Sequence, residues 1–313
     1  MQCCPLCSAY FRGSAPKQAN LHPMTLGAPA ERWSIDLCGE FPSSNGYKMI
    51  FTAICPFSKF AMVAPLRRKD AVSVARAIMD KIILTHSLPY EILSDAGTDF
   101  CNEVSHELYK ILGIKKLKTT ARRPQTNGCI ERWHRTLNSL LAKVVSEHHH
   151  DWSTYLNYVC FAYNCTPHSA TGWSPFLVLM GRQPRWNIDL LLEGREQNDK
   201  TVPEYTAEVI NKLHKMHELV RNHLKAAAEY SATWYNKMVK PVTFYAGDRV
   251  RVYNPAHKQG RCPKWQFFYA DLGTVKQRLN DATYIISCPS WREDRIIHVD
   301  KLKLAEPHPS PFP

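Results

Sequence analysis

The 313-residue sequence lacks any long apolar run that is free of charge and proline. Its most apolar stretch, KMIFTAICPFSKFAMVAPL, is interrupted by Pro56, Lys59 and Pro65. Because a membrane-spanning helix needs about 20 consecutive apolar residues, this stretch indicates buried strands rather than a membrane span. The first ten residues, MQCCPLCSAY, also lack the basic and then apolar build of a signal peptide. We therefore expect no membrane partner.

The sequence also lacks the cysteine pattern of a disulfide framework and is poor in acidic residues. Its 11 cysteines are odd in number and mostly scattered, which favours a reducing compartment. Asp and Glu total 28 against 40 Lys and Arg, so the net charge is +12 and the isoelectric point is about 9.2. Such an excess of positive charge predicts a polyanionic partner.

Shifts in composition divide the chain into segments without internal repeats. The first segment, residues 1–25, holds a cysteine cluster and a polar stretch, and the second, 26–186, has the densest alternation of strand and helix patterns. The third, 187–241, carries a long helical pattern in which Ile210, Leu213, His217, Val220 and Leu224 share a stripe. The fourth, 242–306, is rich in strands, and a proline-rich tail at 307–313 is expected to be disordered.

Residues 26–186 predict an α/β fold with a mixed sheet. ERWSIDL, YKMIFTAIC and KFAMVAPL indicate three successive strands, the last two joined by a tight turn at Pro56 and Ser58. DAVSVARAIMDKIILTH indicates a helix capped by Asp70, with a stripe of Val74, Ile78 and Ile82. YEILSD and IKKLKTT read as further strands, with a helix between them that Gly113 ends. Strands followed by alternating helices and strands predict a mixed sheet flanked by helices.

Three carboxylates in this segment are candidates for one site. Asp36 lies inside the first strand on the side opposite Trp33, Ile35 and Leu37, and Asp95 closes a strand where a glycine turn begins. Glu131 lies early in a helix and next to its expected buried stripe, so that it can face inward. The members of that stripe are Ile130, Trp133, Leu137, Leu140 and Val144.

Carboxylates from a strand, a strand end and a helix can converge on hard divalent cations, which prefer oxygen ligands. Each residue also has a structural interpretation. Asp36 is then a satisfied buried polar group, Asp95 a turn former, and Glu131 an ion-pair partner of Arg135.

The spacing and the neighbouring motifs decide between these interpretations. Asp95 and Glu131 are 36 positions apart, and SDAGTDF, ARRPQTNGCIER and NCTPHSATGWSPFLVLMGRQPR accompany them. Together these motifs resemble the integrases of gypsy-type LTR retrotransposons over nearly the whole chain. The resemblance implies a ribonuclease H-like catalytic core at 26–186 and a catalytic, metal-binding triad of Asp36, Asp95 and Glu131 that holds two Mg²⁺ or Mn²⁺ ions.

The resemblance also implies the activity of a polynucleotidyl transferase and endonuclease. Water first trims the 3′ ends of the element's DNA, and the freed 3′-hydroxyl then attacks a phosphodiester of target DNA. Two metal ions suffice for both in-line displacements, so that no Ser, Cys or Tyr nucleophile is required. The implied partners are double-stranded DNA, that is element ends and target, possible contacts with chromatin, and further copies of the chain on DNA. The implied location is the nucleus, after assembly in the cytoplasm.

The basic loop before Glu131 is expected to contact DNA and to flex around it, while the helix fixes Glu131. The family usually shows an aromatic residue and a histidine before the Pro-Gln of this loop, whereas this chain has two arginines, which add positive charge. The expected DNA-binding residues are Lys118, Arg122, Arg123, Gln125, Asn127, Gly128 and Arg132.

The first and last segments are interpreted by the same resemblance. Cys4 and Cys7 match the second half of a His-His-Cys-Cys zinc module whose histidines are missing here, so we expect a truncated remnant with two free thiols. Residues 242–306 are expected to form a small chromo-like barrel with turns at Gly247-Asp248 and Asn280-Asp281. Its strand DRVRVYN points Val250 and Val252 inward and Arg249 and Arg251 outward toward DNA. Most of its aromatic residues are expected to fill the core.

Two alternative functions remain open. The first is a domesticated, non-catalytic DNA- or chromatin-binding protein derived from such an element; the intact triad argues against it and the broken zinc module for it. The second is a related transposase or nuclease with the same fold and metals, against which the long helix and small barrel argue. A tyrosine recombinase is excluded, since no Arg and His constellation surrounds a candidate tyrosine.

Overall fold

The computed structural model describes residues 27–94, 109–118, 128–146, 149–185, 201–239, 242–253, 269 and 271–305. The chain divides into two compact units, which we describe separately. The first unit is Met24–Glu229, and the second unit includes Tyr230–Pro313.

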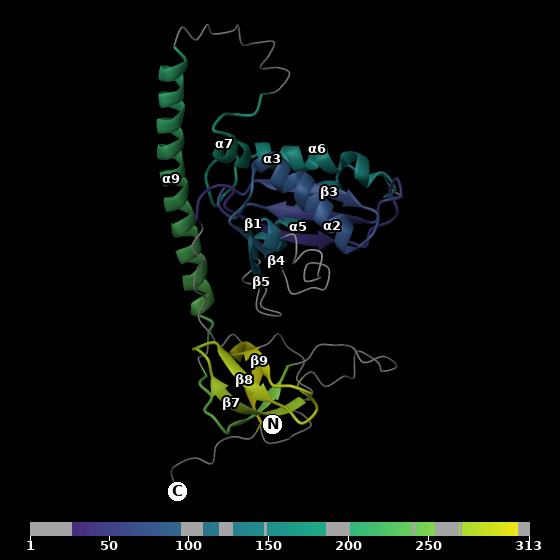
Figure 1. Ribbon diagram of the computed structural model, residues 1–313, viewed down its shortest axis with the longest axis vertical. Coiled ribbons are helices and arrows are strands. Elements are labelled where there is room, and N and C mark those ends of the chain that lie inside the picture. Colours follow the sequence, from purple (N-terminus) through teal and green to yellow (C-terminus); the bar gives the residue numbers. More distant parts are fainter. Residues whose placement is uncertain are drawn as a thin grey trace. The chain divides into compact units, whose positions relative to one another are not determined.

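The first unit is built on a five-stranded mixed sheet in the order β3-β2-β1-β4-β5 (Figure 1). β1 pairs antiparallel with β2, and β2 with β3, whereas β4 runs parallel to both β1 and β5. This arrangement confirms the mixed sheet expected from the sequence. The strand bounds are β1 Arg32–Cys38, β2 Met49–Ile54, β3 Ala61–Leu66, β4 Glu91–Ser94 and β5 Lys115–Lys118.

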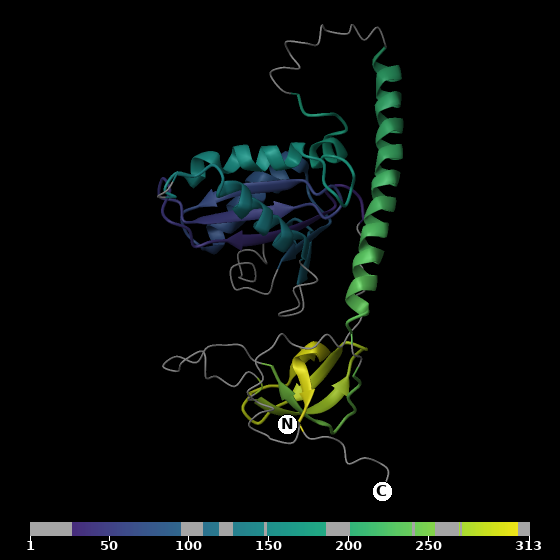
Figure 2. The ribbon, with the colours of Figure 1, turned by 180° about the vertical axis from the view of Figure 1, so that it is seen from behind.

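Helices cover both faces of this sheet. α2 lies in front of the sheet in Figure 1, and α5 crosses the opposite face, seen in Figure 2. Each face therefore has its own core: Trp33 and Ile35 pack with α2, whereas Ile50 and Ile54 pack with α5 and α6. The helix bounds are α2 Ala71–Ile78, the π-helical η1 Met79–Ile83, α3 Leu84–His86, α5 Gly128–Leu141, α6 Trp152–Cys165, α7 Pro175–Met180 and α9 Val202–Asn236.

The first predicted helix is confirmed in its start and its buried stripe. The Asp70 side chain accepts a hydrogen bond from the Ser73 backbone N–H at 2.9 Å, which satisfies one of the unpaired N–H groups of the first turn. Val74, Ile78 and Ile82 are all fully buried. The predicted end of the helix at His86 is confirmed as well, but the sequence pattern did not show that Met79–Ile83 form a π-helical turn, η1.

The stripe predicted for α5 is correct in its first three members, is confirmed in part for Leu140, which packs partly buried against the same core, and is wrong for Val144. Ile130, Trp133 and Leu137 are buried, but the series continues with Leu141, and Leu140 is only half-buried. α5 ends at Leu141, where the Val144 N–H bonds to the Leu141 carbonyl in a tight turn. Val144 lies beyond the helix and is therefore exposed.

Only a limited stretch of the long helix α9 packs against the rest of the first unit. Val220 and Leu224 are buried in the same core as Trp33, and His217 Nε2 lies 2.9 Å from the Val178 carbonyl oxygen of α7. Ile210, which the sequence placed on the same stripe, is 48% exposed because it precedes this packed stretch by two helical turns.

The second unit contains an all-antiparallel sheet in the order β10-β6-β7-β8-β9. Pairing of β9 with β10, which would close the sheet, is not among the strand pairs of the described residues. The strand bounds are β6 Arg249–Val252, β7 Asp271–Arg278, β8 Thr283–Ser287, β9 Arg295–His298 and β10 Leu302–Leu304, with the 3-10 turn η4 Val299–Lys301 between the last two.

The core of the second unit agrees with the predicted alternation. Val250 and Val252 point inward, whereas Arg249 is exposed and Arg251 half-buried. Both predicted turns are present: the Asp248 N–H bonds to the Tyr245 carbonyl, and the Asn280 side chain accepts from the backbone of the β7–β8 hairpin. Of the aromatic residues, Phe244, Tyr269 and Tyr284 are buried, Trp291 is half-buried, Tyr245 is exposed, and Trp265 and Phe267 lie outside the described residues.

Among the described residues, no helix is both long and apolar enough to cross a membrane.

Asn164 of α6 pairs with the edge strand β3 as another strand would. Its Oδ1 accepts from the Ala61 N–H and its Nδ2 donates to the Ala61 carbonyl, both at 2.8 Å. The side chain is buried, so water cannot replace these bonds. The amide therefore both satisfies the edge of the sheet and fixes the position of α6.

Replacing Asn164 with Leu should destabilise the first unit by about 2–3 kcal/mol, because it leaves the buried Ala61 N–H without its partner and the Ala61 carbonyl with only the weak Cys160 thiol donor. Urea unfolding followed by tryptophan fluorescence measures the change. Asn157→Leu, at an exposed position of the same helix, should stay within about 0.5 kcal/mol. Equal effects of the two substitutions would contradict this account.

Candidate active site

Asp36 lies on the face of the sheet that α5 covers. β1 alternates, so Trp33 and Ile35 enter one core while Asp36 and Cys38 point to the other face. The Asp36 side chain is 25% exposed, and its Oδ1 accepts the backbone N–H of Leu37 at 2.8 Å. The carboxylate is thus fixed through one of its oxygens and partly exposed.

A histidine of α5 stands beside this carboxylate. His134 Nδ1 lies 3.9 Å from Asp36 Oδ2. On the other side of the ring, His134 Nε2 lies 2.7 Å from Thr52 Oγ1, and this hydroxyl also donates to the Asp36 backbone carbonyl at 3.1 Å. Thr52 is fully buried on β2. These contacts join β1, β2 and α5 at one point.

Cys38 and Asn138 form a second pair like that of Asp36 and His134, two residues further along β1 and four residues further along α5. The Cys38 sulfur lies 3.9 Å from Asn138 Oδ1 and 4.0 Å from Asn138 Nδ2. Burial raises the pKa of the Cys38 thiol; the contact with Asn138 opposes this, and the negative charge of Asp36 adds to it. Because residues two apart on a strand meet residues four apart on a helix, β1 and α5 run alongside each other in register.

Glu131 lies in the first turn of α5, three positions before His134. Residues three apart share a flank of a helix, so Glu131 lies one turn before His134 on the flank that faces Asp36. Its side chain is exposed and is not buried between the helix and the sheet. The buried stripe of α5 fixes how the helix is rotated about its axis, so that apolar residues occupy the positions that face the sheet.

The remaining predicted site residues divide into described and undescribed ones. Gly128 is the first residue of α5, Arg132 is exposed beside it, and Arg249 and Arg251 lie on β6 of the second unit. Lys118 ends β5, but its side chain is not described. Outside the described residues lie Asp95, Arg122, Arg123, Gln125, Asn127, Cys4 and Cys7. Within the part of the chain that the structure describes, no three His, Cys, Asp or Glu side chains are grouped as a metal site.

Positive charge gathers near the start of α5, and sequence analysis missed one contributor. Lys59 is buried, and its ammonium donates to the Pro56 carbonyl at 2.7 Å and lies 3.8 Å from the Cys129 sulfur. Burial, together with smaller contributions from the charges of Lys59 and Arg132, lowers the pKa of His168 to about 4. A lone lysine in an apolar run carries no sequence signal of this placement.

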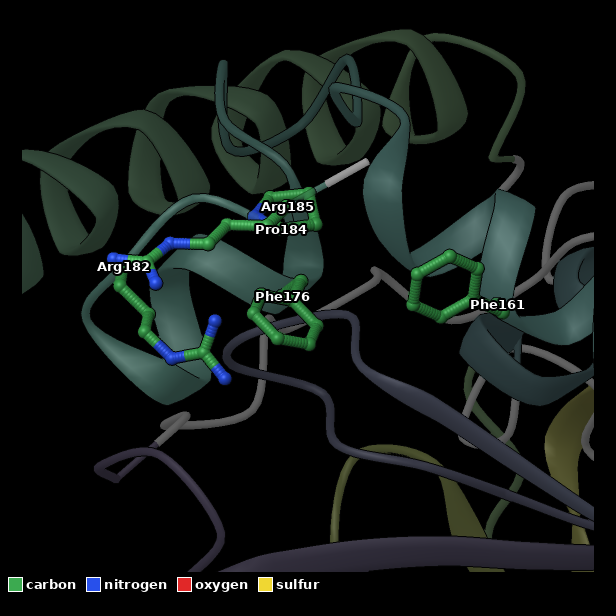
Figure 3. Close-up of a pocket in the computed structure, with 5 residues that line it drawn as sticks. All are labelled: Phe161, Phe176, Arg182, Pro184 and Arg185. Atoms are coloured by element: carbon green, nitrogen blue, oxygen red, sulfur yellow. The ribbon is translucent and has the colours of Figure 1, made fainter. Parts of the chain in front are cut away.

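A separate pocket of about 700 Å³ lies at α6 and α7. It is lined by Phe161, Phe176, Arg182, Pro184 and Arg185, with the Arg182 guanidinium 5.2 Å from the centre of the Phe176 ring (Figure 3). None of these residues was predicted to carry chemistry, and none belongs to the Asp36 site. The pocket combines apolar walls with two positive charges.

Comparison with known proteins agrees with the geometry. Residues 27–124 match the family model described as "Integrase core domain". The chain is 28% identical over 300 residues to the "Retrovirus-related Pol polyprotein from transposon 412" of Drosophila melanogaster, covering 90% of this chain and 23% of that protein. It is 30% identical over 176 residues to the human "Gypsy retrotransposon integrase-like protein 1", covering 54% of this chain and 32% of that protein. The chain thus spans about a quarter to a third of these relatives.

Among solved structures, a chain of the simian T-cell lymphotropic virus intasome, determined in complex with a PP2A regulatory subunit, is similar with a TM-score of 0.56. The two share 14% identity over 96% of this chain and 87% of that one, so the likeness concerns the fold. Residues 27–124 thus match an integrase core domain, on a fold similar to that of a chain of this intasome. Within that class, the resemblance to the integrases of gypsy-type retrotransposons is confirmed.

The environment of His168 predicts an unusual titration. Its ring should gain a proton near pH 4 instead of near 6.5, and the folded state should lose stability as pH falls from about 6.5 to about 4, because the unfolded chain binds this proton first. Solvent screens the half-buried ring, so the loss should be at most about 2 kcal/mol. NMR titration of the ring, identified by its absence in His168→Gln, measures the midpoint, and a value near 6.5 would refute this environment.

Proposed function

We propose that the chain is a retroelement integrase that performs divalent-metal-dependent 3′-end processing and DNA strand transfer. The observation that carries this proposal is the docking of α5 on β1. It sets His134 and Asn138 against Asp36 and Cys38, with Glu131 one turn earlier on the same flank. A strand acid and a helix acid are thereby brought to one face of an integrase core domain.

We propose Asp95 as the third acid of this site. β4 runs parallel to β1, with Ser34 opposite Leu93. Asp36 lies two positions beyond Ser34 in sequence, and Asp95 lies two positions beyond Leu93. This shared offset supports a triad of Asp36, Asp95 and Glu131, since parallel strands present their carboxyl ends at the same edge of a sheet.

The residues present fit Mg²⁺ or Mn²⁺. The Asp36 side chain is partly exposed, and a neutral imidazole stands beside it. When bound, two such cations supply an activated oxygen nucleophile and stabilise the leaving oxygen at phosphorus. Asp36, fixed by the Leu37 N–H, and Glu131, carried on a rigid helix, would hold them.

Double-stranded DNA is the proposed partner, as element ends and as target, with several copies of the chain assembled on it and the nucleus as the place of action. Lys59 and Arg132 supply positive charge beside α5, and the loop residues from Arg122 to Asn127 are proposed to hold the DNA backbone. We propose that the second unit is a chromo-like barrel that contacts DNA or chromatin through Arg249 and Arg251.

The test of catalysis is Glu131→Gln, which keeps the shape of the side chain and removes its charge. With Mg²⁺ and DNA matching the element ends, both end processing and joining should fall by about 100-fold or more, because the metals supply several kcal/mol of transition-state stabilisation. DNA binding should change little. Glu218→Gln, at an exposed position of α9, is the control. Inactive wild-type chain that still binds DNA would instead favour the domesticated, non-catalytic alternative.

Contact between the second unit and DNA phosphates predicts a specific salt dependence. Arg249→Gln in the full chain should lower the slope of log affinity against log salt by about one unit, because one phosphate contact is lost. Arg278→Gln is the matched control, since it removes the same charge from the same unit at a position that is not proposed to contact DNA. Fluorescence anisotropy with labelled DNA measures both slopes. Unchanged slopes for Arg249→Gln would leave the second unit without a role in backbone binding.

A further inference from the structure

The pocket at α6 and α7 is lined by side chains that the proposed function does not use. Phe161 belongs to α6 and Phe176 to α7, whereas Arg182, Pro184 and Arg185 follow the end of α7. In Figure 3 the Phe161 ring lies on one side of the pocket and the other labelled side chains lie on the opposite side. The volume of about 700 Å³ falls within the range of about 300–1,000 Å³ that is usual for ligand pockets.

The two ends of α7 fix the positions of Phe176 and Arg182. Before Phe176, the Ser174 hydroxyl accepts the Leu177 N–H at 3.2 Å and so begins the helix. Gly181 ends the helix in the left-handed conformation, with φ of 71°, and its N–H bonds to the Leu177 carbonyl at 2.8 Å. Beyond this turn the Arg182 guanidinium lies 5.2 Å from the centre of the Phe176 ring. The local fold therefore builds this side of the pocket without a ligand.

The two guanidinium groups of this pocket have no anionic partner among the described residues, where neither Arg182 nor Arg185 takes part in an ion pair. The contact of Arg182 with the Phe176 ring is a cation–π contact, which positions the guanidinium but supplies no hydrogen-bond acceptor. A guanidinium presents its N–H donors in a planar fork that binds a carboxylate through two parallel hydrogen bonds. Two such groups beside apolar walls suit a ligand that joins carboxylates to an apolar group.

The walls of the pocket distinguish between the anions that could bind there. Phosphates lie on the outside of a DNA duplex and carry no apolar group that would fill a space lined by two phenyl rings. An acidic peptide offers both parts, carboxylates for the guanidinium groups and an apolar side chain for the pocket. The position of the pocket agrees with this choice. α6 is held to the edge strand β3 by Asn164, whereas the loop proposed to hold DNA follows β5, at the opposite edge of the sheet.

We propose that this pocket binds an acidic peptide segment of a partner protein. One aromatic or large aliphatic side chain of the segment enters the pocket against Phe176, and flanking carboxylates pair with Arg182 and Arg185. Charge complementarity carries the choice of partner: the chain has a net charge of +12, which attracts an acidic protein and repels a second copy of the chain. The proposal does not depend on catalysis at Asp36.

The experiment measures the binding of labelled peptides to the full chain by fluorescence anisotropy at physiological ionic strength. The probe is a short peptide of Asp and Glu with one central phenylalanine. Two control peptides separate its parts: one has serine in place of the phenylalanine, and the other has Asn and Gln in place of the acids. The probe should bind about tenfold more tightly than either control, because each control lacks one of the two contacts.

Substitutions in the pocket identify the site. Arg182→Gln should weaken binding of the probe by about tenfold, because a charge-assisted hydrogen bond is lost. Phe161→Ser, at a position that is 42% exposed, should weaken it in the same direction. Arg67→Gln is the matched control, since Arg67 is also exposed and lies 5.4 Å from the centre of the Tyr47 ring, outside the pocket. Tyr205→Ser, at an exposed position of α9, is the control for Phe161→Ser. Both controls should keep the wild-type affinity, and thermal unfolding establishes that each variant is folded.

Several outcomes would overturn the proposal. Equal binding of the probe and the serine peptide, or equal losses in Arg182→Gln and Arg67→Gln, would mean that the positive charge of the chain alone attracts acidic peptides. DNA affinity should not change in Arg182→Gln, and a loss as large as that for the probe would assign the pocket to nucleic acid. A change from oligomer to monomer in this variant, measured by sedimentation, would assign it to a contact between copies of the chain. None of these results bears on catalysis, which Glu131→Gln tests separately.

Discussion

The burial of the apolar stripe of α5 is the interaction on which the rest of this face depends. Ile130, Trp133 and Leu137 pack with Ile50 and Ile54 of β2, and once they are buried the helix cannot rotate without exposing them. Burying one such side chain contributes about 1.5–3 kcal/mol. The polar flank that carries Glu131, His134 and Asn138 is therefore fixed toward β1 by side chains that take no part in its chemistry.

β1 is subject to the complementary constraint. Its alternation buries Trp33 and Ile35 in the core on the α2 side, and the same alternation places Asp36 and Cys38 on the α5 side. A shift of one residue in the pairing with β2 would exchange these two sets and bury the carboxylate. The apolar residues of the opposite core thus determine that an acid is presented here. Function at Asp36 depends on packing on both faces of the sheet.

The regular parts of this architecture could be predicted because their signals are local. Alternation over seven residues identified β1, and Asp70 with the stripe at Val74 identified the first helix. The predictions failed where the end of a helix, or contacts between residues far apart in the sequence, determine the structure. α5 ends at Leu141, where the chain turns, so the stripe that sequence periodicity extended to Val144 stops short. The contact of Thr52 with His134 joins residues 82 positions apart, and no periodicity reveals it. The same holds for Lys59 beside Cys129.

The junction of Thr52, His134 and the Asp36 backbone also shows why its geometry is fixed. Thr52 is buried, so a departure of the imidazole would break the 2.7 Å contact of its hydroxyl with Nε2 where water cannot replace it, at a cost of about 1–3 kcal/mol. The ring is thus held between Thr52 of β2 and Asp36 of β1, with Nδ1 3.9 Å from the Asp36 Oδ2 atom. One buried hydroxyl therefore fixes the side chain of α5 that stands beside the acid.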